Sequence, residues 1–252
     1  MAYYTRDTGR RRWLRWLLAG IVVLVILAVA GPFIYNHFIN RAPAPLSLSS
    51  SAPPSTPAGT AGTTASAGTA ATGSLAGTWT PGSGSVVGYR VNEVLLGQSG
   101  TAVGRTTSIT GHMTIQGHTV TAATFTVPMA SVHSNQGERD NNFDGRIMEV
   151  ATYPTAKFTL TSPIDLAPLP SAGTVKSYTV HGKLTLHGTT RTVTFTLTAE
   201  RSVSATGGSQ IKVAGDIPVL FSDYNIQNPS FAGFVTTQDH GLLEFLLVFN
   251  RT

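Results

Sequence analysis

The chain has 252 residues, of which 41% are hydrophobic and only 12% are charged. Its net charge of +5 comes from residues 1–41, which carry six arginines and one acidic residue, whereas residues 76–252 carry eleven basic and eleven acidic side chains. Most of the chain therefore has no net field to attract phosphate, which argues against a nucleic-acid partner. The chain has no cysteine, so disulfides and thiolate chemistry are excluded.

The N-terminal segment is typical of a membrane anchor. Residues 1–15 form a basic arm, and an uncharged run from Trp16 to Tyr35 follows it. About twenty apolar residues cross a hydrocarbon core of roughly 30 Å, so we predict a single transmembrane helix over residues 16–36. The arginines before this run predict a cytoplasmic N-terminus, and hence a cell-membrane protein whose folded domain lies on the outer face.

A cleaved signal peptide is the alternative interpretation of this segment. Residues 10–12 would be its basic region, and the Ala-Val-Ala sequence at 28–30 resembles a cleavage site. The apolar run continues through residues 33–35, which favours a retained anchor. Both interpretations place the folded domain outside the cytoplasm, either anchored or secreted.

The segment after the anchor has the composition of a linker. Between residues 41 and 77, 33 of 37 positions are Ala, Ser, Thr, Pro or Gly. Such a sequence cannot bury enough apolar surface to offset its chain entropy. We therefore predict a disordered linker over residues 37–76 and one folded domain over residues 77–252.

The folded domain shows the period-two alternation of half-buried β-strands, clearest in TVTFTLT at 192–198. We predict eight strands, near residues 85–95, 107–116, 119–131, 155–165, 173–186, 190–203, 209–221 and 240–251. Eight antiparallel strands predict an all-β fold, a closed up-and-down barrel that either fills with side chains or holds one small ligand.

One stretch of the domain, residues 136–149, fits a short helix. It places Arg139, Phe143 and Ile147 on one side, with Met148 beside them. An internal glycine weakens this helix, and we expect its charged residues to pair with one another on its surface. The apolar residues of the helix would lie at one end of the barrel, either as a gate or as a plug.

One set of alternating positions is apolar and would face the barrel interior, and we expect no charged residue in this inward-facing set. The alternation does not distinguish a hollow barrel from a solid core, so a ligand-binding protein and a surface interaction module both stay open. The predicted ligand-binding residues on the wall and the helix are Tyr89, Val91, Phe125, Val127, Phe143, Ile147, Met148, Phe158, Phe195, Leu197 and Phe245.

Titratable residues form no convincing catalytic or metal-binding set. The six histidines of the domain show no HxH or HExxH spacing, and the strand parity of His181 and His187 predicts that both face outward.

A hydrolase triad can be drawn from Asp239 and His240 with Ser222 and Asp223, but no GxSxG nucleophile elbow accompanies it. An enzyme acting on a small lipid would instead use polar groups such as Asp223, Tyr224 and His240 near one end of the barrel. We predict no catalytic residues, no metal and no cofactor, and an enzyme acting on a small lipid is the least favoured alternative.

Four motifs follow one another in the domain: ERDNNF at 138–143, YPTAKF at 153–158, GKLTLHGTTR at 182–191 and DYNI at 223–226. In this order and spacing they resemble the YceI-like family of lipid- and polyisoprenoid-binding proteins, over about residues 77–252. The resemblance implies a lipocalin-like, eight-stranded antiparallel barrel around an elongated apolar tunnel. It also implies isoprenoid-tailed or fatty-chain ligands such as quinones, and no required metal.

These observations together predict a membrane-anchored, extracytoplasmic protein that holds or carries an apolar lipid inside its barrel. Its partners would be an isoprenoid or fatty-chain lipid and the cytoplasmic membrane, which it reaches through the N-terminal helix.

Overall fold

The computed structural model describes most of the folded domain and a small part of the N-terminal region. The described residues are 16–17, 19–24, 42–51, 74–95, 97–203, 208–230 and 235–252. Within these ranges no helix is both long enough and apolar enough to cross a membrane. The predicted arm at 1–15 lies outside the described residues, as does most of the predicted helix at 16–36 and of the linker at 37–76, so these stay predictions.

Residues 16–17 and 19–24 are helical, and the described residues from 42 onward form one antiparallel sheet with five short helical segments. The strands are β1 (Gly77–Pro81), β2 (Val86–Leu95), β3 (Gln98–Thr106), β4 (Thr110–Gln116), β5 (Thr119–Pro128), β6 (His133–Ser134), β7 (Thr155–Leu160), β8 (Ile164–Asp165), β9 (Val175–Leu186), β10 (Thr189–Val203), β11 (Ser209–Leu220), β12 (Val235–Thr237) and β13 (His240–Arg251). The helical segments are η2 (Leu48–Ser51), η3 (Met129–Ser131), α2 (Gly137–Asn142), η4 (Phe143–Ile147) and η5 (Phe221–Tyr224).

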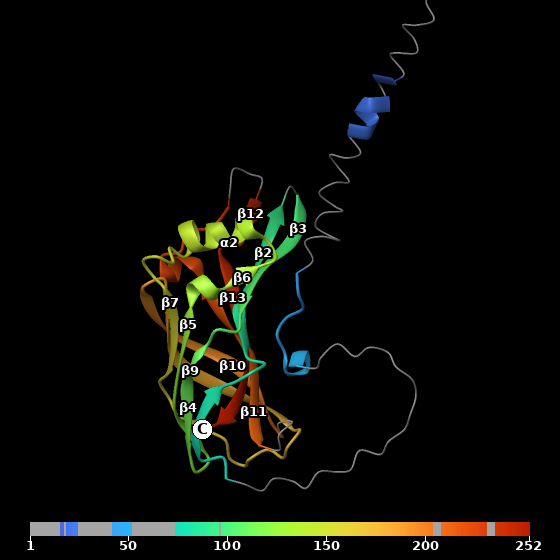
Figure 1. Cartoon of the computed structure of the whole chain (residues 1–252). Coiled ribbons are helices and arrows are strands. Elements are labelled where there is room, and N and C mark those ends of the chain that lie inside the picture. Colours follow the sequence, from blue (N-terminus) through green and yellow to red (C-terminus); the bar gives the residue numbers. More distant parts are fainter. Residues whose placement is uncertain are drawn as a thin grey trace, which may run out of the picture.

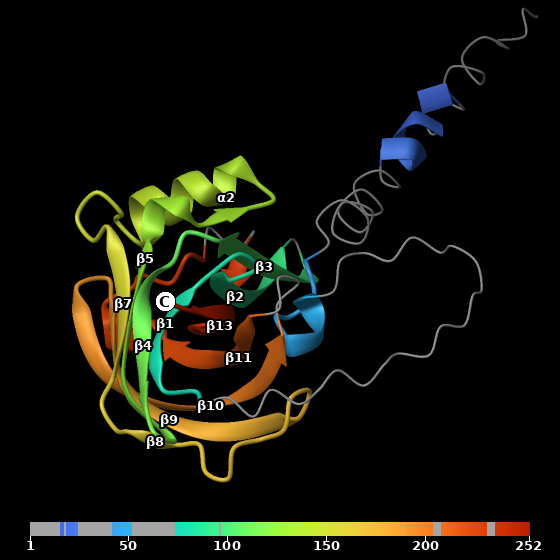
Figure 2. The ribbon, with the colours of Figure 1, turned by 60° about the horizontal axis from the view of Figure 1, so that its bottom comes forward.

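Eight of these strands close into a barrel. The order is β1-β4-β5-β7-β9-β10-β11-β13, and β1 pairs with β13 as well as with β4, which completes the ring. Figure 2 shows these strands curving around a common interior. The predicted all-β class, eight-stranded antiparallel barrel and short helix are therefore confirmed.

The membership of the ring differs from the predicted set of strands. β1, which that set lacked, is a ring member, whereas β2, the first predicted strand, pairs with a different part of β13. β2 also pairs with β3, another strand absent from the prediction, from Leu95 opposite Gln98 to Val87 opposite Thr106. The β2–β3 hairpin thus extends the wall on one side of the barrel (Figure 1). β3 contains two glycines, which are depleted in strands, and only one large apolar side chain, Val103, so its sequence pattern is weak.

The alternation of side chains gives the wall two distinct faces. Along β9 every second residue from Tyr178 to Leu186 is buried, while His181 and Lys183 between them are exposed. Successive side chains of a strand point to opposite faces, so the apolar set gathers inside the barrel. β9 turns into β10 through His187 and Gly188, both with positive φ, as two-residue hairpin turns of type I′ require.

The predicted helix at 136–149 is shorter than expected. The α-helical part ends at Asn142, and the next turn is a wider π turn in which the Met148 N–H donates to the Phe143 carbonyl at 2.8 Å. Gly145 lies in this turn, where its low helix propensity favours departure from regular α geometry. The wider turn directs both Phe143 and Met148 into the interior, where both are buried.

The two ends of the barrel are built differently. At the end formed by β1, which we name the Trp79 end, Trp79 is 0% exposed and donates its indole N–H to the Leu75 carbonyl at 2.9 Å. At the opposite end, which we name the α2 end, the β2–β3 hairpin and the helix α2 lie above the wall (Figure 1). β13 runs from the α2 end at His240 to the Trp79 end at Arg251.

Candidate functional site

The barrel encloses a cavity of about 830 Å³. Its wall comes from the inward faces of the ring strands and from β2, with α2 and η4 at one end. All eleven residues predicted to bind a ligand line this cavity: Tyr89, Val91, Phe125, Val127, Phe143, Ile147, Met148, Phe158, Phe195, Leu197 and Phe245. The interior is thus not packed shut, and whether these side chains touch a ligand stays a prediction.

Three aromatic rings line the middle of the cavity. Phe195 on β10 makes edge-to-face contacts with Phe158 on β7, at 5.7 Å between ring centroids, and with Phe245 on β13, at 5.8 Å. Gly182 on β9 makes room for the first ring, because a Cβ there would lie 2.2 Å from Phe158 Cε2. The rings give the wall a large apolar area with little side-chain freedom.

At the α2 end a second aromatic pair joins the wall to the helix. Tyr89 on β2 stacks on Phe143 of η4, with centroids 5.1 Å apart and ring planes inclined by 15°. The Tyr89 ring lies over Gly104 of β3, where a Cβ would come within 2.3 Å of Tyr89 Cε1. The glycine in this weakly patterned strand therefore has a structural role, since it lets the ring lie between β3 and the helix.

An ion pair faces the cavity beside this stack. Arg139 Nη2 of α2 donates to Glu93 Oε1 of β2 at 2.9 Å, and the two side chains are only 14% and 11% exposed. Arg139 also donates to Asn135 Oδ1 at 3.0 Å. The expectation that helix charges would pair along the helix surface is thus wrong for Arg139, because its partner comes from a strand 46 residues away.

The cavity reaches the surface next to the helix. Glu138, Asn142 and Arg146 line the cavity and are also exposed. The charged residues of the lining are three acidic and three basic, so the lining carries no net charge: Glu93, Glu138, Glu244, Arg139, Arg146 and Lys157. The expectation of a wholly uncharged lining fails at the α2 end. The parity of Glu93 with Tyr89 and Val91 on the same strand could have revealed it.

Burial sets the protonation of the phenol at the α2 end. It raises the pKa of the Tyr89 hydroxyl to about 12, and the nearby Arg139 guanidinium opposes this shift only in part. Removing a phenolate from water is unfavourable, so the neutral form persists to a higher pH than it does in an exposed tyrosine. A protonated phenol can donate a hydrogen bond to an oxygen in the cavity.

His181 faces outward as predicted, but His187 does not. Its side chain is 6% exposed, with Nδ1 at 3.1 Å from the Tyr224 carbonyl oxygen and its ring 4.4 Å from that of Tyr153. The hairpin turn, with its positive φ at His187, breaks the strand parity on which the prediction relied. His187 thus fastens the β9–β10 turn to the chain that leaves η5.

The hydrolase-like residues do not form an enclosed site in the described structure. Tyr224 is 2% exposed and packs in the core, whereas His240 is exposed and pairs with Asp239 Oδ1 at 2.7 Å. The hydrogen bond with His240 lowers the pKa of the Asp239 carboxyl. Among the described residues no group of three His, Asp or Glu side chains is placed to hold a metal ion.

Residues 80–249 match the YceI-like domain family. A polyisoprenoid-binding domain from Saccharophagus degradans, implicated in plant cell wall breakdown, has 18% identity and a TM-score of 0.56, and the match covers 70% of this chain and 99% of that chain. BcnA from Burkholderia cenocepacia has 22% identity and a TM-score of 0.48, covering 65% and 95%. The YceI protein of Campylobacter jejuni has 18% identity and a TM-score of 0.46, covering 57% and 82%. No curated protein sequence matches this chain.

Proposed function

This chain belongs to the YceI-like domain family, and we propose that its barrel holds one apolar lipid, an isoprenoid or fatty-chain molecule, which it exchanges with the membrane that anchors it. The observation that carries the proposal is the cavity of about 830 Å³ inside a closed barrel. Sites for small molecules commonly have volumes of about 300–1,000 Å³. The proposed role is binding and carriage without a chemical reaction.

The wall of the cavity suits an alkyl or isoprenoid tail. Rings of Phe158, Phe195 and Phe245 line its middle, and aliphatic side chains such as Val180 and Leu184 line the strand between them. Each methylene that leaves water for such a wall gains about 0.8 kcal/mol. A bilayer offers the tail nearly the same gain, so transfer between membrane and barrel is close to balance and the protein can both load and unload.

The α2 end suits a neutral polar headgroup. Glu93 and Arg139 already neutralise one another there, so this buried pair offers no free counter-charge to an anionic headgroup such as a diphosphate, and the other cation at this end, Arg146, is exposed to water. The protonated Tyr89 hydroxyl can instead donate to a carbonyl or hydroxyl oxygen. We therefore infer an uncharged headgroup with hydrogen-bond acceptors, such as that of an isoprenoid quinone.

The structure of the cavity favours lipid binding over the two alternative functions. A surface module with a solid core requires a filled interior, whereas the barrel contains a cavity lined by predicted wall residues. The enzyme alternative relied on His240, and the pair that His240 forms with Asp239 is exposed on the surface, outside the cavity lining.

Lipid analysis of the protein purified from membranes tests the proposal. We expect an isoprenoid or fatty-chain lipid to be extracted at about one molecule per barrel and identified by mass spectrometry. Protein that is empty after purification, and that takes up no isoprenoid or fatty-chain lipid from detergent solution, would overturn the proposal.

Two neighbouring residues on β10 provide a matched pair of variants. Phe195→Asp places a charge on the cavity wall, while Thr196→Asp places the same charge on the exposed face of the same strand. We expect the first variant to lose lipid uptake and the second to keep it. If Phe195→Asp does not fold, Leu197→Trp fills part of the cavity without a charge and should reduce uptake.

A further inference from the structure

A charged cluster of Arg90, Arg105 and Glu244 lies on the outer wall of the barrel, and of the three only Glu244 also borders the cavity. Glu244 of β13 accepts from Arg90 Nε of β2 at 2.5 Å and from Arg105 Nη2 of β3 at 3.3 Å. Although its side chain points outward, Glu244 is only 5% exposed, and Arg90 is 14% exposed. Gly88 lies between Glu244 and Arg105 in the strand register, so no side chain separates the carboxylate from the guanidinium.

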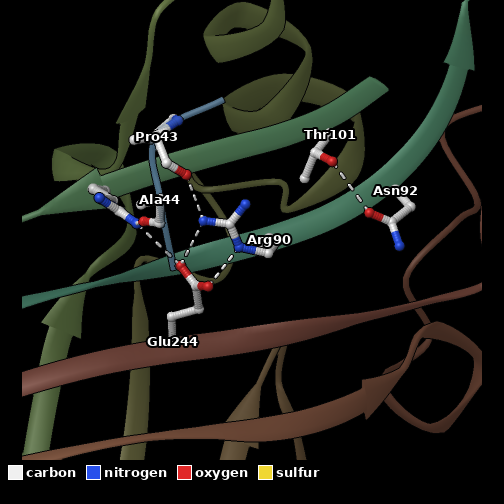
Figure 3. A network of polar contacts seen from close by, with 7 residues as sticks. Pro43, Ala44, Arg90, Asn92, Thr101 and Glu244 are labelled. Atoms are coloured by element: carbon white, nitrogen blue, oxygen red, sulfur yellow. Dashed lines mark hydrogen bonds and ion pairs between the residues drawn. The ribbon is translucent and has the colours of Figure 1, made fainter. Parts of the chain in front are cut away.

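The cluster is covered by a segment of the chain that precedes the folded domain. Arg90 Nη2 donates to the Pro43 carbonyl at 2.7 Å, and Arg105 Nη2 donates to the Ala44 carbonyl (Figure 3). Two arginines face one carboxylate, which cannot accept from all of their N–H groups. The carbonyls of Pro43 and Ala44 accept two of the remaining hydrogen bonds. We name residues 42–51 the strap. After these contacts it continues into η2, which contacts β10 and β11.

The prolines of the strap favour the extended backbone that this contact requires. Prolines at 43 and 45 fix their own φ and hold the preceding alanines in extended conformations. Such a segment approximates a polyproline II helix, whose carbonyls project outward with no internal hydrogen bonds. It loses little chain entropy when it docks, and proline has no N–H that would be buried without a partner. The contact is made through the backbone, so it depends on shape rather than on side chains.

The cluster lies nearer to the α2 end of the barrel than to the Trp79 end. Arg90 lies opposite Leu242 and Gly88 opposite Glu244, near the start of β13 at the α2 end. At about 3.4 Å per residue, Glu244 is roughly 14 Å from the α2 end of this strand and roughly 24 Å from its Trp79 end. Figure 1 shows the strap beside β2 and β3, on the way down to η2.

We propose that the cluster of Arg90, Arg105 and Glu244 is a docking site for the strap, and that docking holds the α2 end of the barrel toward the bilayer. The inference rests on the proposed function and on the predicted transmembrane helix at 16–36. From residue 36 to Pro43 the chain can span at most about 25 Å. A docked strap therefore makes the tether seven residues long instead of the forty or so of the whole linker, and it brings the polar end of the cavity nearest to the membrane.

Spin labels test whether the strap docks in solution. The chain has no cysteine, so Ser49→Cys in η2 and Thr196→Cys on the exposed face of β10 can be labelled as a unique pair in the full chain. We expect a narrow distance distribution. It should broaden when Arg90, Arg105 and Glu244 are all replaced by threonine, which removes both donors and leaves no buried charge behind. A broad distribution in the parent chain, or an unchanged narrow one in the triple variant, would overturn the docking site.

Two deletions of equal length test whether docking positions the barrel. Deleting residues 42–51 removes the strap, whereas deleting residues 61–70 shortens the linker equally and keeps the strap. In proteoliposomes we expect the first deletion to slow uptake of an isoprenoid quinone from the bilayer on the order of tenfold, because a longer free tether lowers the effective concentration. The second deletion should leave the rate unchanged. Equal rates for both would overturn the positioning role.

Uptake from detergent solution separates this inference from the proposed function. Without a bilayer the tether has no effect, so both deletions should bind the quinone as well as the parent chain does. If no chain binds it in detergent, the proposed function fails, and with it the positioning role. The spin-label result stands independently, as evidence for or against the docking site itself.

Discussion

The two ends of the barrel differ in how they are closed, and the difference separates stability from binding. The Trp79 end is sealed by apolar packing, with Trp79 and Phe249 almost wholly buried. The α2 end is covered by a short helix, a stacked aromatic pair and an ion pair, next to exposed residues that line the cavity. Close packing resists change, whereas a polar, partly hydrated end can open at lower cost. We therefore expect the largest loss of unfolding free energy from changes at the first end, and smaller losses, together with effects on the ligand, from changes at the second.

The largest expected effect is at the Trp79 end. Replacing Trp79 by alanine removes a fully buried ring and its hydrogen bond to Leu75, so the free energy of unfolding should fall by about 3–5 kcal/mol. Denaturant unfolding measures the change. A loss below about 1 kcal/mol would mean that this end is not the sealed one.

The α2 end should respond to alkaline pH. The pKa of Tyr89 is about 12 in the folded chain against an ordinary value of 10.0, so the folded state favours the neutral phenol. The resulting stability, about 2–3 kcal/mol, is fully present below pH 10 and is lost as the pH rises through 12. Unfolding measured between pH 9 and pH 12 should show this loss, and Tyr89→Phe should lack it. A pH dependence equal in both proteins would contradict the burial of this hydroxyl.

Breaking the ion pair between Arg139 and Glu93 should destabilise the fold, because it leaves one buried charge without its partner. Arg139→Ala leaves the Glu93 carboxylate without its guanidinium in a site that is 11% exposed, which should lower the free energy of unfolding by about 1–3 kcal/mol. The double variant with Glu93→Gln should recover most of this loss, because it leaves no unpaired carboxylate in this partly solvated site. A double-mutant cycle in denaturant measures the coupling, and additive effects would show that the two charges do not interact.

The smallest expected effect concerns ligand selectivity. Glu93→Gln leaves the Arg139 guanidinium unneutralised at the α2 end, so affinity for an isoprenyl diphosphate relative to an isoprenoid quinone should rise about tenfold, or 1.4 kcal/mol. Competition binding in detergent measures this ratio. Lys183→Gln, on β9, serves as a charge control, because that lysine is exposed and does not line the cavity. An unchanged ratio in Glu93→Gln would place the headgroup elsewhere.

The period-two pattern predicted the wall of the barrel well, because the alternation within each strand shows which of its residues are buried and which are exposed. The inward positions of β9 and β10 follow from alternation alone, and all eleven predicted binding residues line the cavity. Prediction failed where a residue's surroundings come from distant parts of the chain. The partner of Arg139 is on β2, and Gly104 makes β3 weak in propensity while providing space for the ring of Tyr89. The parity of His187 was lost at a turn.

By itself the sequence determined the all-β class, the eight-stranded barrel and the apolar lining, because strand alternation is a local property that any window of the chain displays. The family membership followed from the order of four motifs. Only the tertiary structure decided that the interior is hollow, that β1 closes the ring, and that charges gather at one end and under the strap. Cavities and ion pairs of this kind depend on the separation of residues that are far apart in the chain, and that separation is set by the closure and register of the whole sheet.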